Sequence, residues 1–287
     1  MHSITAATKE ISDIAVGSVV SVNGVKFVKL NSNNQFVAVA PSICPHFATG
    51  MYMQDFTSQM CASAPTPSGT DYFPIGVLTD RRDNKTYEVR KFADGNCWMV
   101  DNLAYSGVTE DGCLKTTFNG NTDSTPTNIF GDGTYGDCRY PYESISTLDV
   151  NKYGYMYNWQ AAVQDPNAYY GNDYQPPQPV RGICPDGWYL PTGGSSGQFQ
   201  ALYIAAGAPQ TGFFQPGGNW NGACAGRTDN IGTLLYQVDS GRYWSSLSVD
   251  RYDGGDLYIG VSAGAVNPTN SKAGKNMAVS VRCVKMP

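Results

Sequence analysis

Cys184-Pro-Asp-Gly-Trp-Tyr-Leu-Pro-Thr192, followed at once by a helical pattern over 196–206, is the stretch that decides the fold. Four apolar residues recur there at positions i, i+3, i+4 and i+7: Phe199, Leu202, Tyr203 and Ala206. This spacing puts them on one face of a helix. Ser195 or Ser196 is suited to cap its start, and Gly207 ends it. We therefore predict an amphipathic helix preceded by an irregular segment that begins with a cysteine.

Short strands are predicted on both sides of this helix. Three short C-terminal strands are predicted, over 243–246, 256–262 and 279–283. Apolar and polar residues alternate in the last two, so each of these should bury one face and present the other. Upstream, strands are expected over 77–79, 86–92 and 153–157, with a short helix over 159–163. A β-hairpin is expected around Asn23-Gly24, followed by a strand over 36–39. Strands and helices in this mixture predict an α+β fold.

The composition is that of a loop-rich extracellular protein rather than a cytosolic enzyme. Charged residues make up only 15% of the 287 residues, whereas glycines number 32 and tyrosines 19. An average globular chain is about one quarter charged. The net charge is −5, and no basic run is longer than Arg81-Arg82. Nucleic acid is therefore excluded as a partner, because binding its phosphates requires clustered lysine and arginine.

Two domains are expected from the distribution of proline, serine and glycine. Residues 62–74 are rich in these residues and have the composition of a linker. We therefore predict a small β-rich N-terminal module with its linker over 1–75 and a larger domain over 76–287. No apolar stretch of about 20 residues is present, so no membrane span is expected. No signal peptide is apparent, and the Met-His-Ser start is compatible with a removed leader or anchor.

The cysteines indicate disulfides and an oxidising compartment. The chain holds eight of them, widely spaced: Cys44, Cys61, Cys97, Cys113, Cys138, Cys184, Cys224 and Cys283. With only two histidines, His2 and His46, a histidine-containing zinc site is disfavoured. Eight cysteines allow 105 pairings, so the sequence leaves the connectivity open. A disulfide between Cys113 and Cys138 would cross-link the long irregular region over 104–150.

Several motifs resemble one known family. They are Leu78-Thr-Asp-Arg-Arg-Asp-Asn-Lys-Thr-Tyr-Glu-Val89, Ala93-Asp-Gly-Asn-Cys-Trp-Met-Val-Asp-Asn-Leu103, Tyr153-Gly-Tyr-Met-Tyr-Asn-Trp159, the 184–192 stretch, Tyr243-Trp-Ser-Ser246 and Ser280-Val-Arg-Cys-Val284. In this order they resemble the Fibrobacter succinogenes major paralogous domain family. The resemblance covers 78–287 and leaves the N-terminal 75 residues outside it.

The family is similar to C-type-lectin-like proteins. The resemblance therefore implies short twisted antiparallel sheets, two helices and long stapled loops. It also implies a Cys184–Cys283 bridge, whose loop of about 100 residues is worth roughly 4–5 kcal/mol by chain entropy. A Cys61–Cys97 pair accompanies relatives with this N-terminal flank. Cys44 and Cys224 then remain as the last pair, which would tie the small module to the larger domain.

The same superfamily contains the variable proteins of diversity-generating retroelements, which place variable residues on one C-terminal face. The matching stretch here is 247–272, and its residues at 250–256 are all reachable from asparagine codons by changing adenines. Tyrosines there would supply rigid contact area and small polar residues adaptable hydrogen bonds. The predicted ligand-binding residues are Ser248, Asp250, Arg251, Tyr252, Asp253, Asp256, Tyr258, Ser262, Asn267, Asn270 and, outside the stretch, Trp220. The other tryptophans are expected in the core.

These observations favour a non-catalytic protein displayed on a cell or virion surface, with a protein or glycan on another surface as its ligand. One alternative is a structural subunit of a pilus, cell surface or virion that assembles through the N-terminal module. Another is a hydrolase with paired carboxylates. A catalytic triad would have to use His46. No cofactor is expected, although the loop residues Asp123, Asp132 and Asp137 are of the type that binds calcium.

Overall fold

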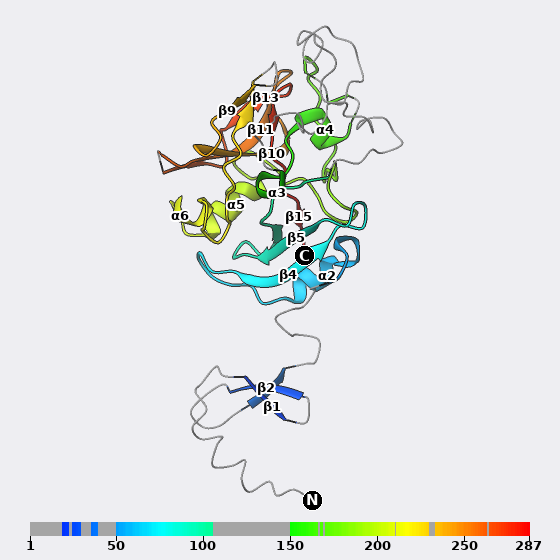
Figure 1. The fold of residues 1–287 in the computed structure, drawn as a ribbon, viewed down its shortest axis with the longest axis vertical. Helices are drawn as coiled ribbons and strands as arrows, with labels where there is room; N and C mark the ends of the chain where they lie inside the picture. Colours follow the sequence, from blue (N-terminus) through cyan, green and yellow to red (C-terminus); the bar gives the residue numbers. More distant parts are fainter. Residues whose placement is uncertain are drawn as a thin grey trace, which may run out of the picture. The chain divides into compact units, whose positions relative to one another are not determined.

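A computed structural model describes residues 50–105 and 150–287, except positions 166, 169, 210, 230–232 and 263, together with the backbone of three strands before residue 40 (Figure 1). The chain forms two compact units, Met1–Phe47 and Ala48–Pro287. The first contains the antiparallel strands β1 (Val19–Val22), β2 (Val25–Lys29) and β3 (Phe36–Val39). Val22 pairs with Val25, which confirms the predicted hairpin at Asn23-Gly24.

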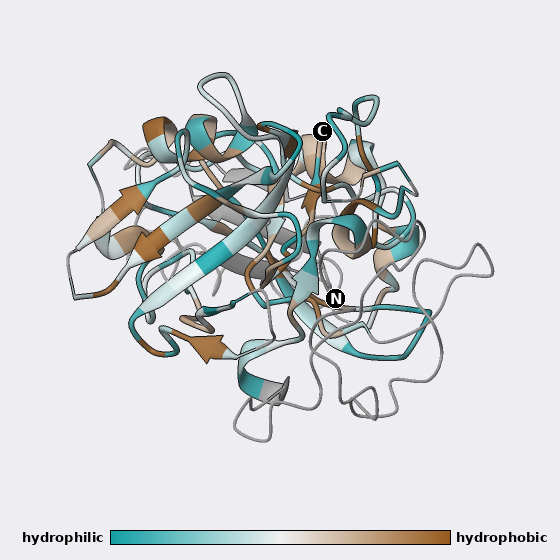
Figure 2. Ribbon diagram, turned by 90° about the horizontal axis from the view of Figure 1, so that it is seen from above, coloured by the Kyte–Doolittle hydropathy of each residue, from teal (hydrophilic) through white to brown (hydrophobic). Residues whose placement is uncertain are grey.

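The second unit is a mixed α+β structure whose sheets are antiparallel. Its first sheet has the order β15–β6–β5–β4, so the C-terminal strand joins strands from the start of the unit. The strands are β4 (Phe73–Thr79), β5 (Thr86–Lys91), β6 (Cys97–Met99) and β15 (Val284–Lys285). Figure 2 shows hydrophobic and hydrophilic residues along the strands of the structure; in β5, every second residue is buried. The strands predicted over 77–79 and 86–92 are thus confirmed.

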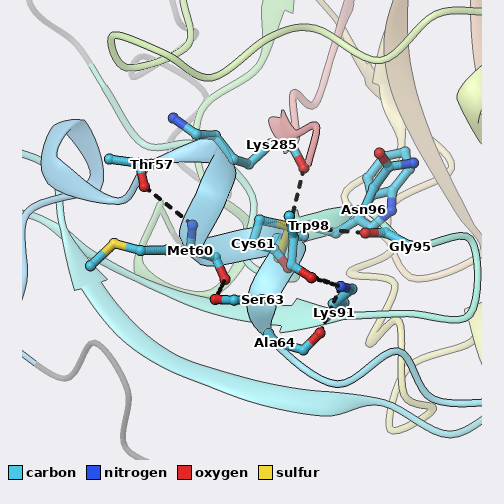
Figure 3. The surroundings of a disulfide bond; sticks show 12 residues. Thr57, Met60, Cys61, Ser63, Ala64, Lys91, Gly95, Asn96, Trp98 and Lys285 are labelled. Atoms are coloured by element: carbon cyan, nitrogen blue, oxygen red, sulfur yellow. Dashed lines mark hydrogen bonds between the residues drawn. A yellow bond between two sulfur atoms is a disulfide. The ribbon is translucent and has the colours of Figure 1, made fainter. Parts of the chain in front are cut away.

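The stretch predicted to be a linker belongs to the second unit. A short 3₁₀ turn, η1 (Met53–Asp55), and the helix α2 (Ser58–Ser63) precede β4. Thr57 caps α2 by accepting from Met60 N, and the ammonium of Lys91 donates to the Cys61 and Ala64 carbonyls at its other end (Figure 3). Phe56 and Cys61 are fully buried. The unit therefore begins at Ala48 rather than near residue 76, because the segment before β4 contributes buried side chains.

The second large sheet contains β10 (Ser240–Ser248), β11 (Asp253–Gly260), β12 (Ala265–Asn267) and β13 (Lys272–Gly274). β11 is central: β10 pairs along one edge, while β12 and β13 pair with opposite ends of the other. One face packs on the main core through Tyr243, Leu257 and Ile259, all fully buried. The strand predicted at 243–246 lies in β10, and the one predicted at 256–262 lies in β11 up to Gly260, after which the chain turns.

Besides α2, the described residues form four short helices: α3 (Val150–Tyr153), α4 (Trp159–Val163), α5 (Gln198–Ala205) and α6 (Thr211–Phe214). The predicted helices at 159–163 and 196–206 are confirmed as α4 and α5. Gly197, not a serine, precedes α5; instead Thr192 Oγ1 accepts from Gln198 N while Gln198 Oε1 accepts from Thr192 N. The small sheets are β14 (Ala278–Val279) with β7 (Tyr157–Asn158), and β8 (Arg227–Thr228) with β9 (Leu234–Leu235).

Two of the strand predictions are wrong in part. Residues 153–157 hold the end of α3 and only the first residue of β7, rather than one strand. Alternation over 279–283 predicted an exposed polar face, yet Ser280 and Arg282 are as fully buried as Val279 and Val281. This segment lies between two sheets, because Ser280 exchanges backbone hydrogen bonds with Arg242 and Trp244 of β10.

Two predicted disulfides are present and one predicted pair is not. Cys61–Cys97 and Cys184–Cys283 are bonded, with Cα atoms 6.0 and 5.8 Å apart. Cys224 is a buried free thiol, which contradicts the Cys44–Cys224 pairing. Burial raises the pKa of this thiol. Cys113 and Cys138 lie outside the described residues. Within the described ranges, no helix has the length and hydropathy needed to span a bilayer.

Candidate functional site

The strongest candidate site is a cavity of about 350 Å³ at one end of β10 and β11, which we call the β10–β11 hollow. It lies on the sheet face opposite the main core. Its lining comes from four segments and is rich in arginine, tyrosine and hydroxyl groups: Arg227, Tyr236, Asp239, Ser240, Arg242, Tyr258, Gly260 and Ser262. Concave sites with a few convergent polar groups are where proteins commonly bind ligands.

The register of β10, β11 and β12 determines which side chains lie at the base of the hollow. Arg242 of β10 pairs with Tyr258 of β11, and Tyr258 pairs in turn with Asn267 of β12, so the three project on the same face. The Arg242 guanidinium carbon lies 5.2 Å from the centre of the Tyr258 ring. Ser240 pairs with Gly260, and a Cβ at Gly260 would come within 2.7 Å of the Tyr258 hydroxyl. Glycine at this position therefore lets the tyrosine ring lie against the sheet.

A buried ion pair holds Arg242 in place beneath the hollow. Its Nη1 donates to Asp256 Oδ2 at 2.8 Å and to the Lys272 carbonyl at 3.1 Å. The Asp256 side chain is completely buried. Burial raises the pKa of this carboxyl, and the nearby Arg242 and Arg227 charges oppose that rise. Arg242 is thus neutralised by the protein, and its ring contact with Tyr258 fixes the tyrosine.

The opposite wall of the hollow is a strained turn between β9 and β10. Tyr236 and Val238 both have left-handed backbone conformations, with φ of +60° and +67°. Hydrogen bonds from Val238 N to Cys224 O and from Ser240 N to Tyr236 O hold the turn. Tyr236 remains 57% exposed and Val238 62% exposed. A bulky side chain rarely occupies this region, and such strain concentrates at functional sites.

Substituting Val238 by glycine is expected to stabilise the protein by about 1 kcal/mol, because the left-handed conformation costs a β-branched residue roughly 1–2 kcal/mol. Little packing is lost, since Val238 is mostly exposed. The melting temperature should rise by about 2–4 °C. Val249 is a matched control: it is also exposed, at 44%, but is not in the left-handed region, so Val249→Gly should destabilise. Equal effects of the two changes, measured by thermal unfolding, would contradict strain at Val238.

The hairpin tip between β10 and β11, residues 249–252, is a second exposed surface. Asp250 Oδ1 accepts from the backbone of Tyr252 and Asp253, and these hydrogen bonds lower the pKa of its carboxyl. The Tyr252 ring lies 5.1 Å from that of Tyr170, and both are partly exposed. Lys272 Nζ lies 2.7 Å from Asp253 Oδ2, and this pairing raises the pKa of the lysine. The charges at the tip are therefore largely satisfied by one another.

The predicted site residues do not form one continuous face. Tyr258 and Ser262 line the hollow, and Asn267 is beside Tyr258 by register. Four others lie at or next to the tip: Ser248, Asp250, Arg251 and Tyr252. Asp253 starts β11 there, whereas Asn270 is exposed in the turn before β13. Asn267 uses its side-chain oxygen within that turn, accepting from the Thr269 and Asn270 backbone.

Two of the predictions are wrong because the residues are buried. Trp220 is fully buried among aromatic rings, 5.1 Å from the centre of Trp98, and stacks against Arg282. Asp256 is 3% exposed and serves the ion pair with Arg242. The tryptophans expected in the core are all buried there: Trp98, Trp159, Trp188 and Trp244.

Sequence reasoning missed Arg227, Tyr236, Asp239, Ser240 and Arg242, which complete the hollow. All five precede the 247–272 stretch, and only the folding of β8, the β9–β10 turn and β10 against β11 brings them to it. One sequence signal was available. Arginine and tyrosine recur through this region, and they are the residues enriched at the centres of interfaces.

A second cavity, of about 410 Å³, is lined mainly by polar residues of β5 and the segments after β6 and α3. Three of its polar side chains already have partners within the fold. Asp101 Oδ2 accepts from Glu88 N at 2.6 Å, Asn102 Nδ2 donates to Tyr153 O at 2.8 Å, and Lys85 Nζ donates to the Ala104 carbonyl. It is therefore the weaker candidate.

No group of three histidine, cysteine, aspartate or glutamate side chains suited to a metal ion occurs in the described part of the chain. The loop aspartates Asp123, Asp132 and Asp137, considered for calcium, and His46, considered for a triad, lie outside the described residues. Comparisons with known proteins were negative throughout: no family model matches the chain, and neither a curated protein nor a solved structure matches it.

Proposed function

We propose that this protein is a non-catalytic ligand-binding protein displayed on a surface, and that the β10–β11 hollow is its binding site. The proposal includes a C-type-lectin-like scaffold for residues 48–287. Short antiparallel sheets, few helices and the Cys184–Cys283 bridge support that scaffold. The two disulfides are compatible with an oxidising, extracellular setting.

The observation that carries the proposal is the set of unused hydrogen-bonding groups in the hollow. Within the described part of the chain, the Tyr236, Tyr258 and Ser262 hydroxyls make no hydrogen bond. Tyrosine offers a large rigid surface with little conformational entropy to lose on binding. Each ring is backed by a guanidinium, Tyr236 by Arg227 at 5.6 Å and Tyr258 by Arg242. A rigid, partly apolar surface with free polar groups suits recognition rather than chemistry.

The test is binding of the full chain to printed arrays of glycans and of peptides. Wild type is expected to bind at least one probe, and Tyr236→Ala to weaken that binding about tenfold or more, as at an interface hot spot. Tyr236 is exposed, so its loss should leave folding intact. Tyr52→Ala is a matched control, because Tyr52 is also exposed and also stacked on an arginine, Arg81, at 4.6 Å.

The same arrays distinguish the two surfaces of the second unit. If Tyr252→Ala abolished binding while Tyr236→Ala left it unchanged, the site would be the hairpin tip and not the hollow. If neither change affected binding, the ligand would be held elsewhere and the proposed site would be wrong.

A further inference from the structure

The hollow contains one arginine that forms no ion pair with a carboxylate of the described residues. Arg242 is neutralised by Asp256, but Arg227 has no carboxylate within ion-pair distance among the described residues. Among the described residues its side chain donates only to the Met277 sulfur, a weak acceptor. A guanidinium has five N–H donors in a fixed fork, which matches the two oxygens of a carboxylate. Most donors of Arg227 are thus available to a ligand at the wall of the hollow.

Exposed apolar side chains lie on the segments that border the hollow. Val238 follows Tyr236 in the strained turn, and Val261 N donates to Asp239 O, which places Val261 beside the same turn. Tyr236, Val238 and Val261 are exposed by 57%, 62% and 37%. Exposed aromatic and aliphatic groups around an arginine are typical of protein interfaces. A sugar would leave the valines without an apolar partner, whereas a peptide side chain would cover them.

Because of Asp239, the ligand must also offer hydrogen-bond donors to a carboxylate. Asp239 is exposed in the lining and forms no ion pair within the described ranges. A ligand that carried only negative charge would be repelled by it. A peptide satisfies both groups, because its backbone N–H groups can donate to Asp239 while an acidic side chain accepts from Arg227.

We propose that the ligand of the hollow is a protein segment in which an aspartate or glutamate pairs with Arg227 and a neighbouring apolar side chain packs on Val238 and Val261. This inference rests on the proposed function, since it names the chemical class of the ligand at the same site. Tyr236, stacked on Arg227, orients the guanidinium toward the acidic side chain.

A phage-displayed library of random 12-residue peptides, selected on the full-length protein, tests the inference. Enriched peptides are expected to carry Asp or Glu beside an apolar residue. Their synthetic forms, measured by calorimetry, should bind Arg227→Ala about tenfold or more weakly, because a charge-assisted pair is lost. Arg227→Lys should recover only part of the affinity, since lysine cannot form the two-pronged contact. Arg81→Ala, at an exposed arginine stacked on Tyr52, is the matched control and should change nothing.

A cycle of substitutions on both sides identifies the pair. Changing the acidic residue of the peptide to its amide should weaken binding to wild type as much as Arg227→Ala does, and should have little further effect on Arg227→Ala. The inference is overturned if selection yields no peptide, if enriched peptides lack acidic residues, or if the amide binds equally well. In those cases the proposed function still stands when glycan binding depends on Tyr236. The proposed function fails separately if peptides bind with the same affinity to wild type, to Arg227→Ala and to Tyr236→Ala.

Discussion

Replacing Arg282 by methionine is expected to lower the free energy of unfolding by about 3 kcal/mol. Arg282 is fully buried and donates to Asn102 Oδ1 at 2.9 Å, to Trp220 O at 2.6 Å and to Asn221 O at 2.8 Å. Methionine fills similar space but leaves all three acceptors without a donor. Each unsatisfied buried acceptor costs roughly 1–3 kcal/mol. Removing the buried guanidinium also removes its desolvation cost, which offsets part of this loss.

The expected loss corresponds to a fall in melting temperature of roughly 6–12 °C for a unit of this size. Urea unfolding, followed by tryptophan fluorescence, measures the change in the free energy of unfolding. Trp220 reports on this region, because the Arg282 guanidinium lies 4.9 Å from the ring centres of Trp220 and Tyr243. Arg81→Met is the control: Arg81 pairs with Asp55 and both are more than half exposed, so it should change stability by less than about 0.5 kcal/mol. A loss at Arg282 no larger than that would mean its hydrogen bonds contribute little.

Removing the Cys184–Cys283 bridge by substituting both cysteines with serine is expected to destabilise the protein by about 4–5 kcal/mol. The bridge joins residues 99 apart in sequence, so it removes much of the conformational freedom of the unfolded chain. The Cys61–Cys97 bridge spans 36 residues and should contribute about 4 kcal/mol by the same reasoning. Denaturant unfolding of each double variant under oxidising conditions provides the values.

Cys224 supplies the control for the bridge experiment. As a buried free thiol it should tolerate Cys224→Ala with a loss of about 1 kcal/mol, from packing alone. A loss near 4 kcal/mol would contradict a free thiol at Cys224. Mass mapping of the peptide that contains Cys224, after alkylation of the unfolded protein, gives an independent check.

Several elements could be predicted because their determinants are local. The spacing of Phe199 and Leu202 identifies a helix whatever it packs against, and both residues are buried in the core. Alternation at Leu257 and Ile259 likewise predicted which side chains of β11 face the core. The motif resemblance added what local patterns cannot supply, namely which distant cysteines pair, as at Cys184 and Cys283.

Other features depended on what covers the second face of a strand. Alternation indicates that one face is buried but carries no information on the other. Asp256 was predicted to be exposed, yet it shares its face with Trp244, whose indole N–H donates to the Tyr157 carbonyl of another sheet. Arg282 was placed on the polar side of a strand and instead lies in the core. Both misplacements have the same cause, because the covering segments are remote in sequence.

The sequence by itself determined the α+β class, the principal helix and the buried aromatic core, since these depend on residue type and short-range periodicity. Only the tertiary structure decided where ligand-binding groups converge. Tyr258 and Ser262 come from the stretch predicted for binding, but the groups that complete the hollow, Arg227 and Tyr236, belong to β8 and the β9–β10 turn. Their approach depends on packing between segments that no local pattern relates. The 184–192 stretch and the helix after it thus predicted the α+β class. The position of the proposed binding surface depended on long-range packing.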